Sequence, residues 1–171
     1  MAEINLSSML ASSVSMADGG RLPTKFTADG LNISPHIGWQ RIPRDTKSIA
    51  IIMNDPDSSK GVWIHWGIFN IPSFLIELKE NIPTERTLEY NMRQVVNDFG
   101  KTGYYGPLNA SGKHKYVFTV CALDTILNLP FNPTGEDLIK AMHGHVLEKA
   151  LIRTHYGSNN IPNTVVRNNG N

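Results

Sequence analysis

The sequence is poor in cysteine and carries no excess of charge of either sign. Cys121 is the only cysteine among 171 residues, so no disulfide can form within the chain, as suits a reducing compartment. Lysine and arginine number 16 and aspartate and glutamate 15, and the two signs are intermixed. This balance predicts neither a nucleic-acid-binding patch nor a basic membrane tail. It leaves room for a local anion site, because one pocket can be positive in a nearly neutral protein.

Long hydrophobic runs are also missing. The first 20 residues are faintly apolar, but they include Glu3 and lack a basic segment, so we interpret them as neither a signal peptide nor a membrane span. We therefore expect a cytoplasmic protein without integral membrane association. Hydrophobic residues make up 40% of the chain, which is enough for a packed core.

Several catalytic signatures are absent. There is no GxSxG, which argues against a serine nucleophile of that type. The stretch GPLNASGKH resembles a phosphate loop only superficially, since five residues separate its glycines and His114 follows Lys113. Two histidines and an aspartate could form a metal triad, but their spacing matches no local metal signature. We expect no metal, no cofactor and no catalytic residues.

Short β-rich runs dominate the first three quarters of the chain. Residues 48–53, 62–71 and 114–123 each predict a strand, and no βαβ alternation occurs. Thr134 and Asp137 predict a helix N-terminus, and apolar residues continue at roughly helical spacing to Leu151, with Gly144 dividing two short helices. The pattern favours a mainly β fold, an antiparallel β-sandwich with short C-terminal helices. The length suggests one domain.

Strand alternation sorts the polar residues of the predicted strands. In residues 114–123, His114 and Tyr116 share one face, whereas Cys121 lies on the other, which argues against a Cys–His catalytic pair. In residues 63–69, alternation places four side chains on one face: Trp63, His65, Gly67 and Phe69. Asp55 and Asp57 follow a buried strand and flank Pro56, whose peptide bond could be cis or trans.

These residues suggest a pocket lined by Asp55, His65, His114 and Tyr116, with Gly106 and Pro107 as a wall. Imidazole and phenol groups can donate hydrogen bonds to an anion, and a carboxylate can orient a histidine and favour its charged form. A second interpretation stays open. Each histidine, taken alone, is equally a core residue bonded to the backbone, the aspartates are turn residues, and the tryptophans are core.

The motifs together resemble the phosphatidylethanolamine-binding protein family, also called the Raf kinase inhibitor protein family. DPD at 55–57 is similar to its DPDAP element, WIHW at 63–66 to its tryptophan-x-histidine strand, and GPLNASGKHKYVF at 106–118 to its glycine-proline loop and His-Arg-Tyr. NISPHIGWQRIP and GHVLEKALIRTHY resemble the smaller prokaryotic branch, in which a GHxL helix closes the chain. The resemblance covers roughly residues 26–156.

The resemblance implies a Greek-key sandwich of two antiparallel sheets. It implies one such domain over residues 1–171, and we expect the tail after about residue 157 to be weakly ordered. It also implies a site for phosphate-like groups, including phospholipid headgroups, and by motif it carries these residues onto that site: Asp55, Trp63, His65, Gly106, Pro107, His114 and Tyr116. Asp57 is expected to brace the turn.

The chain departs from the family pattern at the glycine-proline loop. Leu108 and Asn109 replace the later prolines, Lys115 replaces the usual arginine, and Tyr104 stands where some members have glycine. These changes predict a looser loop and a narrower pocket mouth, so anion binding is the firmer expectation and lipid binding the weaker one.

Three functions follow from these observations. The first is a non-enzymatic binding or regulatory protein with a pocket for a small anion or phosphorylated ligand. The second, implied by the resemblance, is an inhibitor of a serine protease or kinase acting through a surface loop, at residues 73–93 or 104–111. The third and weakest is a hydrolase of a small ester, because no activated nucleophile is evident. The sequence is also compatible with a homodimer.

Overall fold

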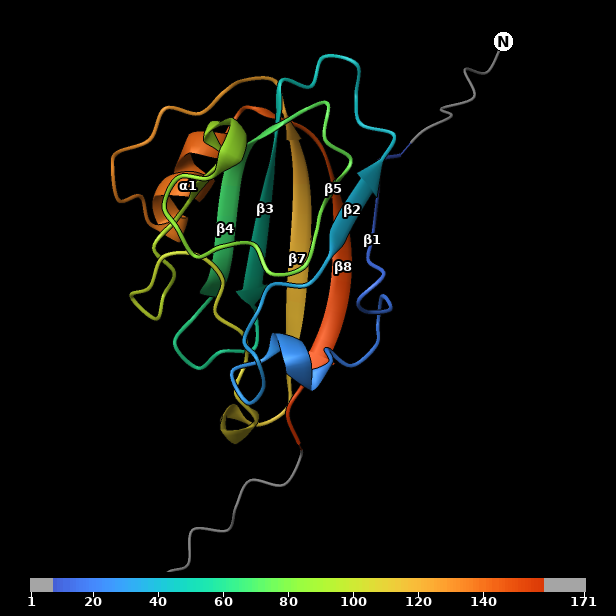
Figure 1. Ribbon diagram of the computed structural model, residues 1–171, viewed down its shortest axis with the longest axis vertical. Helices are drawn as coiled ribbons and strands as arrows, with labels where there is room; N and C mark the ends of the chain where they lie inside the picture. Colours follow the sequence, from blue (N-terminus) through green and yellow to red (C-terminus); the bar gives the residue numbers. More distant parts are fainter. Residues whose placement is uncertain (1–7, 159–171) are drawn as a thin grey trace, which may run out of the picture.

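The computed structural model describes residues 8–158, which form two antiparallel sheets and one short α-helix (Figure 1). The three-stranded sheet has the order β1-β2-β5, with β1 Leu10–Ser12, β2 Ile37–Gln40 and β5 Glu77–Leu78. The larger sheet consists of β6 Arg93–Gln94, β4 Trp63–Pro72, β3 Ser48–Asp55, β7 His114–Leu123 and β8 Val146–Tyr156. The helix α1 is Gly135–Met142, and 3₁₀ turns occur at Thr24–Phe26, Glu89–Asn91 and Asn109–Ser111.

The larger sheet has the strand order β6-β4-β3-β7-β8. Within it, β3, β4 and β6 follow one another, and β7 then returns to lie beside β3. This is the Greek-key arrangement that the resemblance implied. The predicted strand at 114–123 agrees with β7 to the residue, and those at 48–53 and 62–71 agree with β3 and β4 to within two residues at each end.

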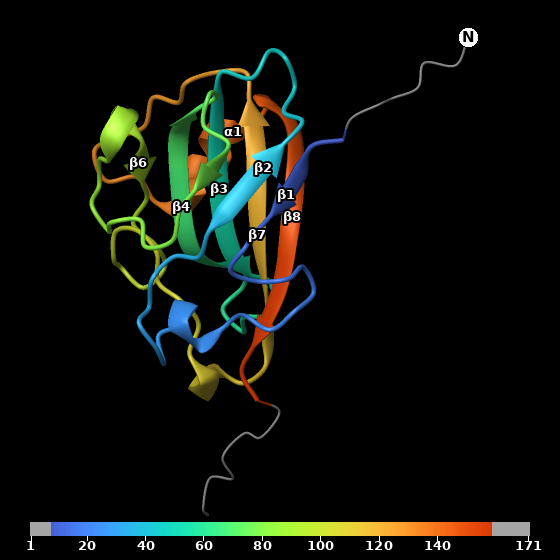
Figure 2. The same cartoon turned by 45° about the vertical axis from the view of Figure 1, so that its right-hand side comes forward.

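The two faces of the larger sheet bury different cores. The inner face packs against the three-stranded sheet, and its buried side chains include Ile51, Met53, Phe118 and Val120. The outer face is covered partly by α1, where Leu138 packs with residues of β3 and β4. Figure 2 shows β2 in front of the larger sheet and α1 behind it. The molecule is therefore a sandwich with one helix outside it.

The predicted helix N-terminus is confirmed. The Thr134 hydroxyl accepts a hydrogen bond from the Asp137 amide, and the Asp137 carboxylate accepts one from the Thr134 amide. This reciprocal capping box satisfies two of the amide groups that a helix start leaves without a partner in the helix.

The second C-terminal helix was a wrong prediction. Residues 146–156 form the strand β8, which pairs with β7 from end to end. Burial alternates along its second half, where Ala150, Ile152, Thr154 and Tyr156 point inward. Gly144, with a φ of +81°, ends α1 by a turn. The helix was predicted from apolar residues at roughly helical spacing. A strand that is buried on one face and half-covered on the other carries apolar residues on both faces, and this can imitate that spacing.

The face assignment along β4 was also wrong beyond His65. The pairing of β3 with β4 runs Met53 with Trp66 and then Asn54 with Ile64, so His65 is an extra residue in a β-bulge. Trp66 belongs to the inner core, whereas Gly67 lies against Val95 and Leu138 on the outer face and Phe69 belongs to the outer core. Simple alternation fails here because the inserted residue reverses the faces of the residues after it, until a second irregularity between Ile68 and Ile71 shifts the register again.

Three smaller points complete the fold. No cis peptide bond occurs among the described residues, so the bond before Pro56 is trans. The predicted weakly ordered tail lies, from residue 159 on, outside the described residues. No helix within residues 8–158 is long and apolar enough to cross a membrane.

Candidate functional site

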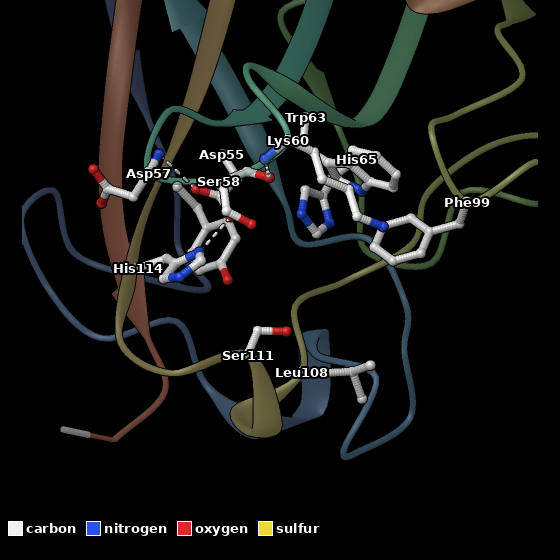
Figure 3. A pocket seen from close by; sticks show the side chains of 12 residues that line it. Asp55, Asp57, Ser58, Lys60, Trp63, His65, Phe99, Leu108, Ser111 and His114 are labelled. Carbon is white, nitrogen blue, oxygen red and sulfur yellow. Dashed lines mark hydrogen bonds and ion pairs between the residues drawn. The ribbon is translucent and has the colours of Figure 1, made fainter. Parts of the chain in front are cut away.

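The predicted strand ends meet at one end of the larger sheet and enclose a cavity of about 440 Å³. β3 ends there with Asp55, and β4 and β7 begin there with Trp63 and His114. The cavity is lined by Asp55, Asp57, Ser58, Ser59, Lys60, Trp63, His65, Phe99, Leu108, Ser111, His114 and Tyr116. Figure 3 shows His114 and Asp57 on one side of it and Trp63 and Phe99 on the other.

The Asp55 carboxylate organises the side of the cavity formed by β7. It is 4% exposed, and its Oδ2 accepts a hydrogen bond from His114 Nδ1 at 2.6 Å (Figure 3). Its Oδ1 accepts from the Asp57 amide at 2.8 Å, and the Asp57 carboxylate accepts from the Lys115 amide. The DPD turn is thus tied to the first residues of β7, which fixes the ring of His114 and places Asp57 in the bracing role that was expected.

His65 forms the opposite side of the cavity, at the β-bulge in β4. Its Nδ1 lies 2.6 Å from the Tyr105 carbonyl oxygen, so Nδ1 carries the hydrogen and donates it. The Tyr105 amide in turn donates to the His65 carbonyl. The ring is 3% exposed and meets Phe99 edge-on at 5.1 Å between centroids. Burial lowers the pKa of His65 below its ordinary value, against the opposing effect of the Tyr105 hydrogen bond, so the free protein holds this ring neutral.

Tyr116 lies between the two histidines at the base of the cavity. Its ring centroid is 5.3 Å from that of His65 and 6.3 Å from that of His114. The residue is 1% exposed, and burial raises the pKa of its phenol, so the hydroxyl keeps its proton at neutral pH. Within residues 8–158 this hydroxyl has no hydrogen-bond partner. It is a donor available to a bound molecule.

Gly106 and Pro107 support the site from behind and do not line the cavity. The Gly106 amide donates to Asn32 Oδ1 at 2.7 Å, and the Pro107 carbonyl accepts from the Ala28 amide. A Cβ at Gly106 would collide with the carbonyl oxygen of Phe26, so only glycine permits this close backbone packing. The same loop reaches the cavity further on, through Leu108 and Ser111.

Sequence reasoning missed Lys60 and Phe99. Lys60 lines the cavity, and its Nζ lies 5.0 Å from the centre of the Trp63 ring (Figure 3). Phe99 contacts Trp63, His65 and Tyr105 and shields the His65 ring from solvent. A signal for Lys60 was present, because it belongs to the short loop that joins two predicted site strands. Phe99 gave none, since a glycine-rich loop does not reveal which side chain folds back.

The site offers no metal centre within the described part of the chain, where no group of three His, Cys, Asp or Glu side chains is arranged to hold an ion. Besides the Asp55 and Asp57 carboxylates, its polar groups are two anchored imidazoles, a phenol, the Lys60 ammonium and serine hydroxyls. The phenol, the ammonium and the hydroxyls can donate hydrogen bonds to an anion, and an imidazole Nε2 can do so when its ring is protonated.

Comparisons with known proteins agree with this fold. The family model described as phosphatidylethanolamine-binding protein matches residues 12–157. The chain is 47% identical to a UPF0098 protein of Methanothermobacter thermautotrophicus over 135 residues, which is 79% of this chain and 89% of that protein. It is 41% identical to a UPF0098 protein of Aquifex aeolicus over 141 residues, covering 81% and 82% of the two chains.

Two crystal structures are also similar. One is a protein of Chlamydia trachomatis described as a homologue of phosphatidylethanolamine-binding protein, with a TM-score of 0.79, 31% identity and coverage of 88% of this chain and 98% of that one. The other is Escherichia coli YbcL, described as a member of the mammalian family, with a TM-score of 0.80, 28% identity and coverage of 88% and 99%.

Proposed function

Because this chain belongs to the phosphatidylethanolamine-binding protein family, we propose that it is a non-enzymatic binding protein whose cavity between β4 and β7 takes a small anion. The ligand is phosphate or the phosphoryl group of a larger molecule. A protein that holds such a group reversibly can act as a regulator, because occupancy of the cavity changes the surface around its mouth.

One observation carries the proposal: both histidines are anchored through Nδ1 and leave Nε2 without a partner in the described chain. Tyr105 holds His65, and Asp55 holds His114. The Tyr116 ring packs near both histidine rings, and its hydroxyl also has no hydrogen-bond partner within residues 8–158. A tetrahedral anion with several oxygens suits these three groups from β4 and β7, with His65 donating once its ring is protonated.

The distribution of charge supports an anion over a cation. The Lys60 ammonium lines the cavity and makes no ion pair with a carboxylate in the described chain, and the Asp55 and Asp57 carboxylates already accept hydrogen bonds from His114 and backbone amides. The carboxylates therefore hold protein groups in place. The Lys60 ammonium and the Tyr116 hydroxyl remain as donors to a ligand, and an imidazole Nε2 joins them when its ring is protonated.

A hydrolase is the weaker alternative. Cys121 lies on the outer face of β7, away from the cavity, and burial raises the pKa of its thiol to about 11. It is therefore a protonated thiol at neutral pH and a poor nucleophile. The histidines could move protons, but among the described residues no serine, threonine or cysteine side chain donates a hydrogen bond to either of them, as an activated nucleophile would.

An inhibitor of a serine protease or kinase is the second candidate, and one surface feature favours it. Phe74 and Tyr90 are 69% and 59% exposed and pack edge to face at 5.5 Å, within the loop region at 73–93. An exposed aromatic pair is suited to docking on a protein partner. Stoichiometric loss of protease or kinase activity, reversed by Phe74→Ala, would support this role, and undiminished turnover across a broad panel would oppose it.

The anion proposal is tested by titrating phosphate while recording the ring signals of the histidines by NMR. His65 and His114 should shift together and saturate, whereas the rings of His36, His143 and His145, which lie outside the cavity, should serve as internal controls. Tyr116→Phe should weaken binding several-fold without unfolding the protein. Unmoved His65 and His114 signals at saturating phosphate would show that the cavity does not bind this anion.

Binding should also depend on pH in a defined direction. His65 is neutral in the free protein because burial lowers its pKa, so an anion that gains a hydrogen bond from Nε2 must bring a proton to the ring. Affinity for sulfate, which does not titrate between about pH 5 and 8, should therefore rise as the pH falls through this window. His65→Gln should flatten this dependence. Equal dependence in both proteins would assign the proton to another group.

A further inference from the structure

A second cavity, of about 510 Å³, lies beside the anion pocket at the end of β7 and β8. It is lined by Gly19, Asp57, Lys113, His114, Lys115, Arg153, Thr154 and His155, and we call it the basic groove. It shares Asp57 and His114 with the anion pocket. Both cavities therefore meet at Asp57 and His114.

Strand pairing concentrates positive side chains in the basic groove. Lys115 of β7 lies directly opposite His155 of β8, and Arg153 occupies the next position on the same face of β8. Lys113 precedes β7 in the loop. Lys113, Lys115 and Arg153 are exposed, and none of the three forms an ion pair with a carboxylate within residues 8–158.

The carboxylates near the basic groove are already used by the backbone. Asp57 accepts a hydrogen bond from the Lys115 amide, and Asp18 accepts one from the Arg153 amide. The whole chain has a formal net charge of only +1, so this cluster of cations is a local feature. A cleft lined mainly by one sign of charge raises the local concentration of oppositely charged ligands.

We propose that the natural ligand is a small molecule with two anionic groups. One phosphoryl group occupies the anion pocket, and a second phosphate or carboxylate reaches past His114 into the basic groove. This inference rests on the proposed function of the anion pocket and adds the class of ligand. The groove is open and its cations are solvated, so the second group adds affinity and selectivity that weaken as salt is raised.

The test compares bisphosphates joined by short alkane chains of increasing length with monophosphates of the same chains, using calorimetry at low salt. One bisphosphate should bind about tenfold tighter than its matched monophosphate, which corresponds to about 1.4 kcal/mol. The double variant Lys115→Ala, Arg153→Ala should lose this advantage and bind the monophosphate as the wild type does. Lys47→Ala, Lys79→Ala removes the same charge from exposed positions outside both cavities and should keep the advantage.

The outcomes separate the two proposals. Monophosphate binding with no bisphosphate gain at any chain length would overturn the two-group ligand and leave the anion pocket intact. If the Lys47, Lys79 control also loses the tighter binding of the bisphosphate, the effect comes from net charge, and the basic groove is not the second site. Absence of monophosphate binding would contradict the proposed function itself. Vesicles that contain phosphatidylglycerol test a lipid surface as the alternative. If the double variant loses binding to these vesicles, and no bisphosphate binds wild type tighter than its monophosphate, the groove contacts a lipid surface and the small-molecule ligand is wrong.

Discussion

The two walls of the anion pocket hold their histidines by different means. On the β7 wall, His114 donates to the buried carboxylate of Asp55, at the start of a regular strand. On the β4 wall, His65 donates to a backbone carbonyl, at a β-bulge, under the ring of Phe99. One imidazole has a negative partner and partial exposure, whereas the other has a neutral partner and is almost fully buried.

This difference gives the two histidines different tasks. On the β7 wall, a buried carboxylate fixes the His114 ring, so this wall presents an imidazole in a set position to the cavity. A neutral carbonyl cannot offset the cost of burying a charge, so His65 stays neutral until a ligand supplies the compensation. The β4 wall therefore couples binding to protonation, and the β7 wall holds its geometry through the hydrogen bond between His114 and Asp55.

The largest effect should come from removing the anchor of the β7 wall. Asp55→Ala leaves His114 without its partner and frees the Asp57 amide, so the free energy of unfolding should fall by about 2–4 kcal/mol. Phosphate binding should be lost with it. Urea denaturation measures the first change and calorimetry the second.

Asp57→Ala is the matched control for this prediction. It removes an exposed carboxylate of the same turn that accepts one backbone hydrogen bond, so it should cost no more than about 1 kcal/mol. Equal losses for the two variants would mean that the turn as a whole, rather than the Asp55–His114 pair, stabilises the β7 wall.

The same contrast explains what the sequence could predict. Alternation placed His114 and Tyr116 correctly because β7 is regular, and the motif order brought Asp55 and His65 to the same cavity. Alternation failed after His65, because the bulge depends on pairing with β3 and on the Tyr105 backbone, contacts between residues far apart in the chain. β8 was mistaken for a helix because it carries apolar residues on both faces of the sheet. That arrangement depends on its pairing with β7 and on the cover of the outer face, which the sequence does not reveal. Phe99 and the basic groove need the folded chain, since Phe99 meets residues distant in the sequence and the groove depends on the pairing of β7 with β8.

A smaller effect should come from replacing the histidine of the β4 wall. His65→Gln loses ring contacts and perturbs the bond to Tyr105, so stability at neutral pH should fall by about 1–2 kcal/mol. The pH dependence of the free energy of unfolding tests the neutral state of His65 more directly. The pKa of His65 is lowered in the folded protein, so the unfolded chain binds more protons and the wild type loses stability as the pH falls below about 6.5.

His65→Gln should lose less stability over this pH range than the wild type, because glutamine does not titrate. His143→Gln, which changes an exposed ring outside the cavity, should keep the slope of the wild type. Denaturation curves at several pH values supply the comparison. An identical slope in the His65 variant would mean that burial does not hold this ring neutral.

The smallest effect should come from opening the β4 wall to water without touching the histidine. Phe99 is partly exposed already, so Phe99→Ala should cost only about 1 kcal/mol of stability. Its removal lets water reach the His65 ring, which weakens the desolvation that lowers the pKa, so the pKa of His65 should rise toward its ordinary value. Phe74→Ala removes an exposed aromatic ring outside the anion pocket and should leave that pKa unchanged. NMR titration of the His65 ring measures its pKa in both variants. If the pKa stays low without Phe99, the strand core beneath the ring keeps His65 neutral, and its aromatic cover does not. The difference between the two walls would then lie in their strands and not in Phe99.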